Sequence, residues 1–196
     1  SKQVVEMGVN VLCEKPVALN GREALEFRRL EQEHPEVKIA VSLQNRLNET
    51  TEELVRIIGS GEHGKVMGIR AEVPWYRPLA YYQAEPWRGR WDQAGSGVMM
   101  NQAIHTIDLM YLLGGPVQRI KASVEQILDY GIEVEDTVSA RFQYENGAIG
   151  HLYATNANFK NEGVNISVDL EHASFRMRDN VLYEVGEGNV ETKLVE

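Results

Sequence analysis

The sequence predicts an α+β fold, in which a mostly antiparallel, open sheet packs on helices in a two-layer domain after the end of a parallel α/β unit. Three observations indicate this class. Strand and helix patterns alternate before residue 45, as in a parallel sheet. Only strand patterns, separated by turn residues, follow residue 116. Between the two regions, residues 95–114 form one long apolar helical pattern.

The first unit, residues 1–45, alternates helix and strand patterns. Residues 9–13 and 37–43 are short, mostly apolar strand patterns, and Asn20-Gly-Arg-Glu23 is a capping box that should open a helix to about Glu33. Residues 1–8 resemble the last turns of a helix whose start is missing. We therefore expect the chain to be cut from a longer protein.

The second unit, residues 46–196, begins with a helix that we expect to open at Thr50 and to stop at Gly59-Ser-Gly61. Residues 65–75 then alternate as a strand, with Met67 on the same face as Ile69 and Val73. Pro74 indicates either an edge position or the end of that strand. Residues 77–93 are predicted to be a long loop rich in tyrosine, tryptophan and arginine.

The remaining sequence predicts strands alone. Asn146-Gly147 is the strongest hairpin signal, and it should join a strand at 137–144 to another at 148–154. Further strands are expected at 120–124, 166–170 and 175–177. One face of this sheet must cover the helices. The other face, if it is open, should meet a second subunit, which predicts a homo-oligomer.

Composition and charge restrict the function. The formal net charge of −9 argues against nucleic-acid binding. No apolar run is long enough to span a bilayer, so no membrane partner is expected. The single cysteine, Cys13, fits a reducing, cytoplasmic location. No set of cysteine and histidine residues has zinc-ligand spacing, and no metal site is predicted.

The helical pattern of residues 95–114 carries three polar side chains on one stripe. Asn101, His105 and Asp108 are spaced i, i+4 and i+7, while the last turns are apolar nearly all round. A buried helix rarely carries such residues unless each has a partner or a task. The pattern therefore fits a functional site, and it fits equally well a core helix whose polar groups are satisfied by neighbouring backbone.

A second polar stretch, Glu14-Lys15-Pro16, directly follows the strand pattern of residues 9–13. Ligands of open α/β sheets bind beyond the carboxyl ends of the strands, where Lys15 would lie. Pro16 forces a turn there and could follow a cis peptide bond. The alternative is a solvent-facing ion pair, which contributes little.

The two stretches together, joined by Asn45-x-Leu47, resemble the Gfo/Idh/MocA family of NAD(P)-dependent oxidoreductases in order and spacing. The resemblance implies that residues 1–45 are the tail end of a Rossmann dinucleotide-binding domain and residues 46–196 a domain for substrate binding and oligomerisation. It implies that Glu14, Lys15 and Pro16 contact the cofactor. The glycine-rich phosphate-binding turn is absent from this sequence. We therefore expect NAD or NADP to bind the full-length parent, and this fragment to bind neither and to be inactive.

The resemblance also implies a reaction, the oxidation of a secondary alcohol on a sugar, nucleotide sugar or cyclitol. His105 is the first candidate for the base that takes the hydroxyl proton, because its pKa lies near working pH, and Lys15 is the second. Many family members carry aspartate where this chain has Asn101, and an amide can only orient a hydroxyl. Arg46 and Asp108 are further candidate substrate contacts, and Asp108 could instead orient His105.

Three residues of the aromatic stretch, Tyr76, Arg88 and Trp91, are also predicted to bind substrate. Aromatic faces stack on sugars, and arginine forks onto phosphate or carboxylate. The alternative is a loop packed by its own aromatic residues. Two other functions remain open: a non-catalytic sugar-binding or dimerisation module, and an NAD-dependent glycosidase.

Overall fold

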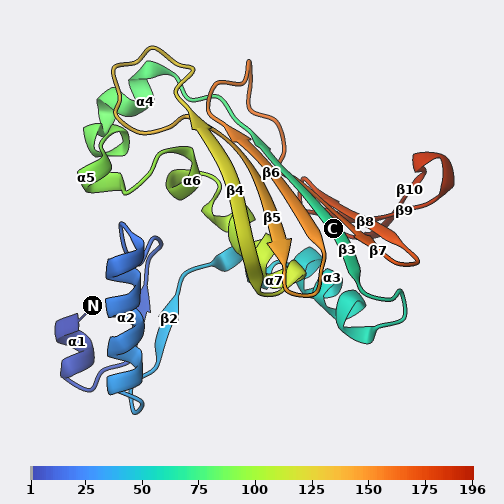
Figure 1. Cartoon of the computed structure of the whole chain (residues 1–196), viewed down its shortest axis with the longest axis horizontal. Coiled ribbons are helices and arrows are strands. Elements are labelled where there is room, and N and C mark those ends of the chain that lie inside the picture. The colour runs from blue at the N-terminus through green and yellow to red at the C-terminus, as the bar shows by residue number, and fades with distance from the viewer. Residues whose placement is uncertain (1) are drawn as a thin grey trace.

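The computed structural model describes residues 2–196, so Ser1, the first residue of the expected 1–45 unit, lies outside it. The N-terminal unit contains α1 (Lys2–Glu6), β1 (Val11–Cys13), α2 (Gly21–Glu33) and β2 (Ile39–Val41). Strands β1 and β2 pair in parallel, and both helices lie beside them in Figure 1. The side chain of Asn20 accepts hydrogen bonds from the backbone of Arg22 and Glu23, which confirms the predicted start of α2.

The second unit is built on an eight-stranded sheet. Its strand order is β10-β9-β8-β7-β3-β6-β5-β4, and only β3 and β6 are parallel neighbours, which confirms a mostly antiparallel sheet. The predicted hairpin at Asn146-Gly147 joins β5 to β6. The strands are β3 (Val66–Pro74), β4 (Val117–Glu125), β5 (Thr137–Tyr144), β6 (Ile149–Thr155), β7 (Asn165–Leu170), β8 (Ser174–Arg178), β9 (Val181–Val185) and β10 (Glu191–Val195).

Helices cover one face of this sheet. The short helix η1 (Gln44–Leu47) leads from β2 into α3 (Glu49–Ser60), and α7 (Ile104–Gly114) packs on β3 and β6. Figure 1 shows α3 and α7 on the same side of the sheet, with the N-terminal unit below α5 and α6. The main core lies between these helices and the sheet. No helix within residues 2–196 combines the length and apolarity that a membrane span requires.

Strand β3 departs from the prediction in one respect. Its register shifts between Val66 and Gly68, so Val66 is buried and Met67 is exposed, the reverse of the expected facing. A bulge inserts one residue and thereby reverses the alternation locally. Pro74 is the last residue of β3, which confirms one of the two predicted alternatives; the other, an edge position, is wrong because β3 lies between β7 and β6.

Three helical predictions also need correction. Helix α3 begins at Glu49, with Asn48 rather than Thr50 before its first turn, although Gly61 ends it in the left-handed conformation as expected. Residues 77–93 are not one loop, because they fold into α4 (Leu79–Ala84), η2 (Pro86–Gly89) and the start of α5 (Trp91–Ala94). The pattern of residues 95–114 is broken into α6 (Val98–Asn101) and α7. A further short helix, η3 (Glu187–Asn189), joins β9 to β10.

The outer face of the sheet, opposite the helices, is polar. Arg70 on β3 lies opposite His151 on β6, which lies opposite Arg141 on β5. On the next row Tyr153, which is 45% exposed, lies between Glu72 and Ser139. The helix-side residues of the edge strand β4, such as Ile120 and Val124, are exposed as well. The open sheet face expected from the sequence is therefore present.

Candidate functional site

Lys15 reaches from the N-terminal unit to the helices of the second unit. It follows β1 at the carboxyl end of the strand, and the Lys15–Pro16 peptide bond is cis. Its Nζ donates a hydrogen bond to the backbone carbonyl oxygen of Asn101 at 3.2 Å. The alternative of a solvent-facing ion pair with Glu14 does not describe this half-buried contact.

The Asn101 carbonyl lies at the break between α6 and α7. The backbone N–H groups of Gln102 and Ala103 both donate to the carbonyl of Val98, at 3.1 and 2.8 Å. The second of these bonds spans five residues, as in a π-bulge, a feature found often at functional sites. One extra residue rotates the rest of the helix by about 100° around its axis. Asn101 therefore does not share a continuous stripe with His105 and Asp108, as the sequence predicted.

His105 lies in the first turn of α7 and is half-buried. Burial lowers the pKa of its imidazole below 6.5, and the positive charge of Lys15 lowers this pKa further, while Asp108 and Glu14 oppose the shift. Its Nδ1 is buried and has no hydrogen-bond partner within residues 2–196. A neutral imidazole keeps one unprotonated ring nitrogen, which can accept a proton. The charge of Lys15 therefore acts directly on the His105 imidazole.

Arg46 and Asp108 bind each other. The guanidinium of Arg46 donates from Nε and Nη2 to the two carboxylate oxygens of Asp108, at 2.8 and 2.5 Å. The Asp108 side chain is only 10% exposed. This hydrogen bond raises the pKa of Arg46. The pair ties η1 to α7 beside His105, so both predicted substrate contacts already have a protein partner.

The other predicted substrate contacts lie in the aromatic segment. Arg88 stacks on the ring of Tyr81 at 4.3 Å and donates to the Tyr81 carbonyl. Trp91 and Tyr76 remain 48% and 39% exposed, and their backbone N–H groups donate to Glu133 and Asn161. These contacts fit the alternative of a segment packed by its own residues, with two aromatic faces left accessible.

Sequence reasoning missed Glu135, which holds the start of α6. Its buried carboxylate accepts hydrogen bonds from the backbone of Gly97 at 2.9 Å and Met99 at 3.2 Å, and from the Ser96 hydroxyl at 2.7 Å. The available signal was the acidic pair Glu135-Asp136 between apolar Val134 and a strand. It also missed Gln102, whose side chain is buried at the helix break.

The glycines before α6 permit close backbone contacts, as the sequence suggested. A Cβ on Gly95 would overlap the carbonyl oxygen of Leu19 from the N-terminal unit, and Gly95 has a φ of 74°. A Cβ on Gly97 would overlap the carbonyl oxygen of Glu135.

We therefore predict that Gly97→Ala destabilises the protein by about 2–3 kcal/mol, because the backbone must move to admit the methyl group. Gly59→Ala is the matched control. Gly59 lies inside α3, and no atom lies within 4 Å of the position that a Cβ would occupy there, so alanine should stabilise by about 0.5–1 kcal/mol. Urea unfolding of both variants measures the difference, and equal effects would contradict the packing of Gly97.

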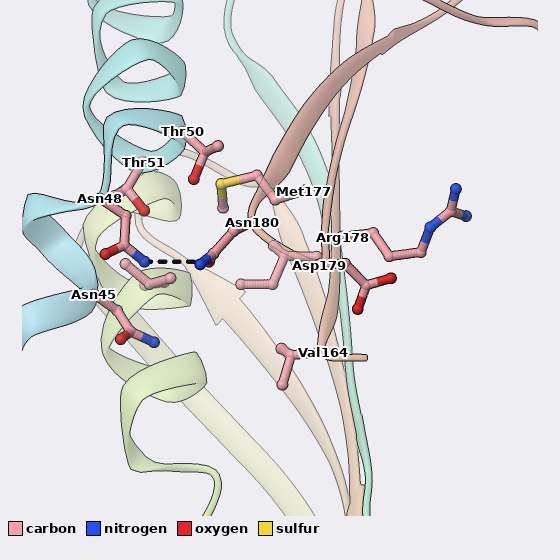
Figure 2. Close-up of a pocket in the computed structure, with 11 residues that line it drawn as sticks. Asn45, Asn48, Thr50, Thr51, Val164, Met177, Arg178, Asp179 and Asn180 are labelled. Carbon is pink, nitrogen blue, oxygen red and sulfur yellow. Dashed lines mark hydrogen bonds between the residues drawn. The ribbon is translucent and has the colours of Figure 1, made fainter. Parts of the chain in front are cut away.

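A cavity of about 300 Å³ is lined by residues of η1, α3, α7, β7 and β8 (Figure 2). Leu109, one turn beyond His105, lines it, as do the amide side chains of Asn45, Asn48 and Asn180. Asn48 precedes α3 but makes no side-chain cap, and its Nδ2 instead lies 3.5 Å from the Asn180 Oδ1. The volume of this cavity lies at the lower end of the range for small-molecule pockets. Amide donors and acceptors over an apolar floor suit a polyhydroxyl ligand.

Comparison with known proteins gives a consistent picture. Residues 51–176 match the family model described as GFO/IDH/MocA C-terminal domain. The chain is 25% identical over 191 residues to a levoglucosan dehydrogenase from Pseudarthrobacter phenanthrenivorans, covering 83% of this chain and 47% of that protein. The chain thus spans about half the length of this curated relative.

Solved structures show the same fold. The WlbA dehydrogenase from Bordetella pertussis, in complex with NADH and UDP-GlcNAcA, superposes with a TM-score of 0.84 at 31% identity, covering 91% of this chain and 54% of that one. Levoglucosan dehydrogenase in complex with NADH and levoglucosan superposes with a TM-score of 0.89 at 20% identity, covering 100% of this chain and 56% of that one.

Proposed function

Because the chain belongs to the Gfo/Idh/MocA family, we propose that it is the substrate-binding part of an NAD(P)-dependent dehydrogenase that oxidises a secondary alcohol of a sugar. One observation carries this proposal. Lys15, from the end of β1, bonds to the helix break that precedes His105, and burial together with the charge of Lys15 lowers the pKa of that imidazole. A proton-accepting group and a cation therefore meet where the two units touch.

The residues of this chain manage the proton in the proposed reaction. The lowered pKa keeps the His105 imidazole neutral at neutral pH, ready to accept the proton of the substrate hydroxyl. Lys15 can donate its remaining N–H groups to the oxygen that loses the proton. Asn101 can orient a neighbouring hydroxyl.

The residues that follow β1 are suited to bind a nicotinamide cofactor. Glu14, Lys15 and Pro16 follow the carboxyl end of this parallel strand, the edge where α/β sheets bind their ligands. These three residues would hold the nicotinamide end. When bound, the nicotinamide supplies the acceptor for the hydride that leaves the substrate carbon.

The proposed substrate is a nucleotide sugar. The relative that binds UDP-GlcNAcA is 31% identical to this chain, whereas the levoglucosan dehydrogenase structure is 20% identical. Two half-buried arginines, Arg77 and Arg88, stack on Tyr81 at 5.4 and 4.3 Å, and their guanidinium groups donate to the backbone carbonyls of Tyr76 and Tyr81. Guanidinium groups of this kind can bind a phosphate or carboxylate group of a ligand.

A substrate screen on the intact protein tests the proposal. NAD+ or NADP+ is combined with UDP-sugars, free sugars and cyclitols, and reduced cofactor is followed by absorbance. Formation of reduced cofactor with a UDP-sugar supports the proposal. Release of an aglycone without net cofactor reduction would indicate a glycosidase, and sugar binding without any turnover would indicate a non-catalytic module.

The proposal includes self-association through the outer sheet face. Tyr153 lies near the middle of this face and is 45% exposed, which suits a contact residue. We predict that Tyr153→Glu reduces the dimer fraction by at least tenfold at micromolar protein concentration, because a buried carboxylate without a partner opposes association. Arg28→Glu on α2 is the control and should leave association unchanged. Light scattering that gives a monomer for the unmodified protein would contradict this part.

A further inference from the structure

We propose that Gln102 is a positioning residue of the reacting centre, and that its side chain holds open the helix break which presents the Asn101 carbonyl to Lys15. The catalytic role of Gln102 rests on the proposed function. The hydrogen bonds described below do not depend on it. Within residues 2–196 the side chain of Gln102 makes no hydrogen bond to Lys15 or His105. Its effect on these residues must therefore pass through the backbone of residues 101–105.

Both ends of the buried Gln102 amide are used. Its Nε2 donates to the Tyr81 hydroxyl at 2.9 Å, and its Oε1 accepts from Asn156 Nδ2 at 3.1 Å. Asn156 Nδ2 also donates to the Tyr82 hydroxyl at 3.1 Å. Gln102 and Asn156 are 6% and 1% exposed. The amide thus ties the helix break to α4 and to the end of β6, far apart in the sequence.

The local sequence does not account for the break. Sharp helix breaks occur mainly at proline, at glycine or serine, or where a π-bulge forms. Residues 98–107 contain neither proline nor glycine, and methionine, glutamine and alanine all favour helix. The break must therefore be stabilised by tertiary contacts. The side chain at the break with specific tertiary hydrogen bonds is Gln102.

Loss of these hydrogen bonds would act on the break in two ways. Tyr81 would lose the donor to its hydroxyl and Asn156 would lose one of its two acceptors, which disfavours the present arrangement of the segment. A continuous helix from α6 into α7 would then compete, and it would occupy the Asn101 carbonyl with an intrahelical bond. Lys15 would lose its acceptor and its charge would move away from His105, leaving Asp108 and Glu14 as the charged groups that act on the imidazole.

The test is an NMR titration of His105 in the intact protein, without cofactor or substrate. Gln102→Met keeps the length of the side chain and removes both polar ends. We expect the His105 midpoint to rise by at least half a pH unit, and Tyr81→Phe, which removes one partner hydroxyl, to give a smaller rise. Gln143→Met is the matched control, because Gln143 makes one side-chain bond, to Gln118, on the outer face of the sheet.

The outcomes separate the inference from the proposed function. A wild-type midpoint in folded Gln102→Met, or an equal rise in Gln143→Met, overturns the inference. If Gln102→Met does not fold, Tyr81→Phe decides alone, and an unchanged midpoint there overturns it. The titration needs no turnover, so an inactive protein would refute the proposed function and leave this result intact. In an active enzyme, Gln102→Met should lower kcat at least tenfold with KM for the cofactor within twofold.

Discussion

Replacing His105 with glutamine should lower the kcat of the intact enzyme by about 10²–10⁴-fold, the usual contribution of a positioned general base. Glutamine keeps a polar side chain of similar reach but cannot accept a proton at neutral pH. The KM for the cofactor should change little, because the substitution affects proton transfer. Steady-state kinetics with the sugar found in the screen measure both constants.

The control for this variant is His151→Gln. His151 lies on the outer face of the sheet, between Arg70 and Arg141. Its replacement should leave kcat unchanged. Full turnover in His105→Gln would remove the imidazole from the mechanism and leave Lys15 as the remaining candidate base.

The second large effect is expected from Glu135→Leu, which should destabilise the protein by about 3–5 kcal/mol. The Glu135 carboxylate is the acceptor for the Ser96 hydroxyl and for two backbone N–H groups at the start of α6. Leucine leaves the buried Gly97 N–H and the part-buried donors of Ser96 and Met99 without this partner. Urea unfolding should show a lower midpoint with an unchanged slope.

Two further variants test whether the loss of stability comes from the hydrogen bonds of Glu135. Glu135→Gln keeps the shape and most of the acceptor capacity, so it should cost clearly less than leucine. Glu133→Gln alters an exposed carboxylate two residues away and should change stability by less than about 0.5 kcal/mol. Equal losses in all three variants would show that the α6 start does not depend on Glu135.

The pH dependence of the reaction follows from the lowered pKa of His105. A base must be neutral to act, so kcat/KM should fall as the pH drops through the pKa of His105. Burial and the charge of Lys15 place this pKa below 6.5. The acid limb of the profile should therefore lie below 6.5 in the wild type and move upward in Lys15→Met. An acid limb above 6.5 in the wild type would contradict the electrostatic description of the site.

Much of the sheet could be predicted because strand signals are local. Alternation over residues 137–144 and the Asn146-Gly147 turn fix both the strand and its partner, and the structure pairs β5 with β6 accordingly. The cap at Asn20 is equally local. The facing of Met67 could not be predicted, because the bulge after Val66 depends on pairing with β7, a strand a hundred residues away.

The sequence predicts which residues form the site, and that assignment stays a prediction, whereas the local backbone geometry was not predicted. Lys15 and His105 were expected to converge from two units, and the structure shows Lys15 bonded to the Asn101 carbonyl and a His105 pKa lowered by burial and by the charge of Lys15. The break beside Gln102 could not be foreseen, because its cause is a set of contacts to Tyr81 and Asn156. Only the folded chain brings these residues together.

The central claim is that Lys15 and His105 act in one centre. A double-mutant cycle on kcat/KM tests it most directly, with Lys15→Met, His105→Gln and the double variant of the intact enzyme. Residues that act as a unit are strongly non-additive. We predict that the double variant is no more than about threefold slower than the worse single variant. Losses that multiply fully would show that the two side chains act independently, and would contradict the account.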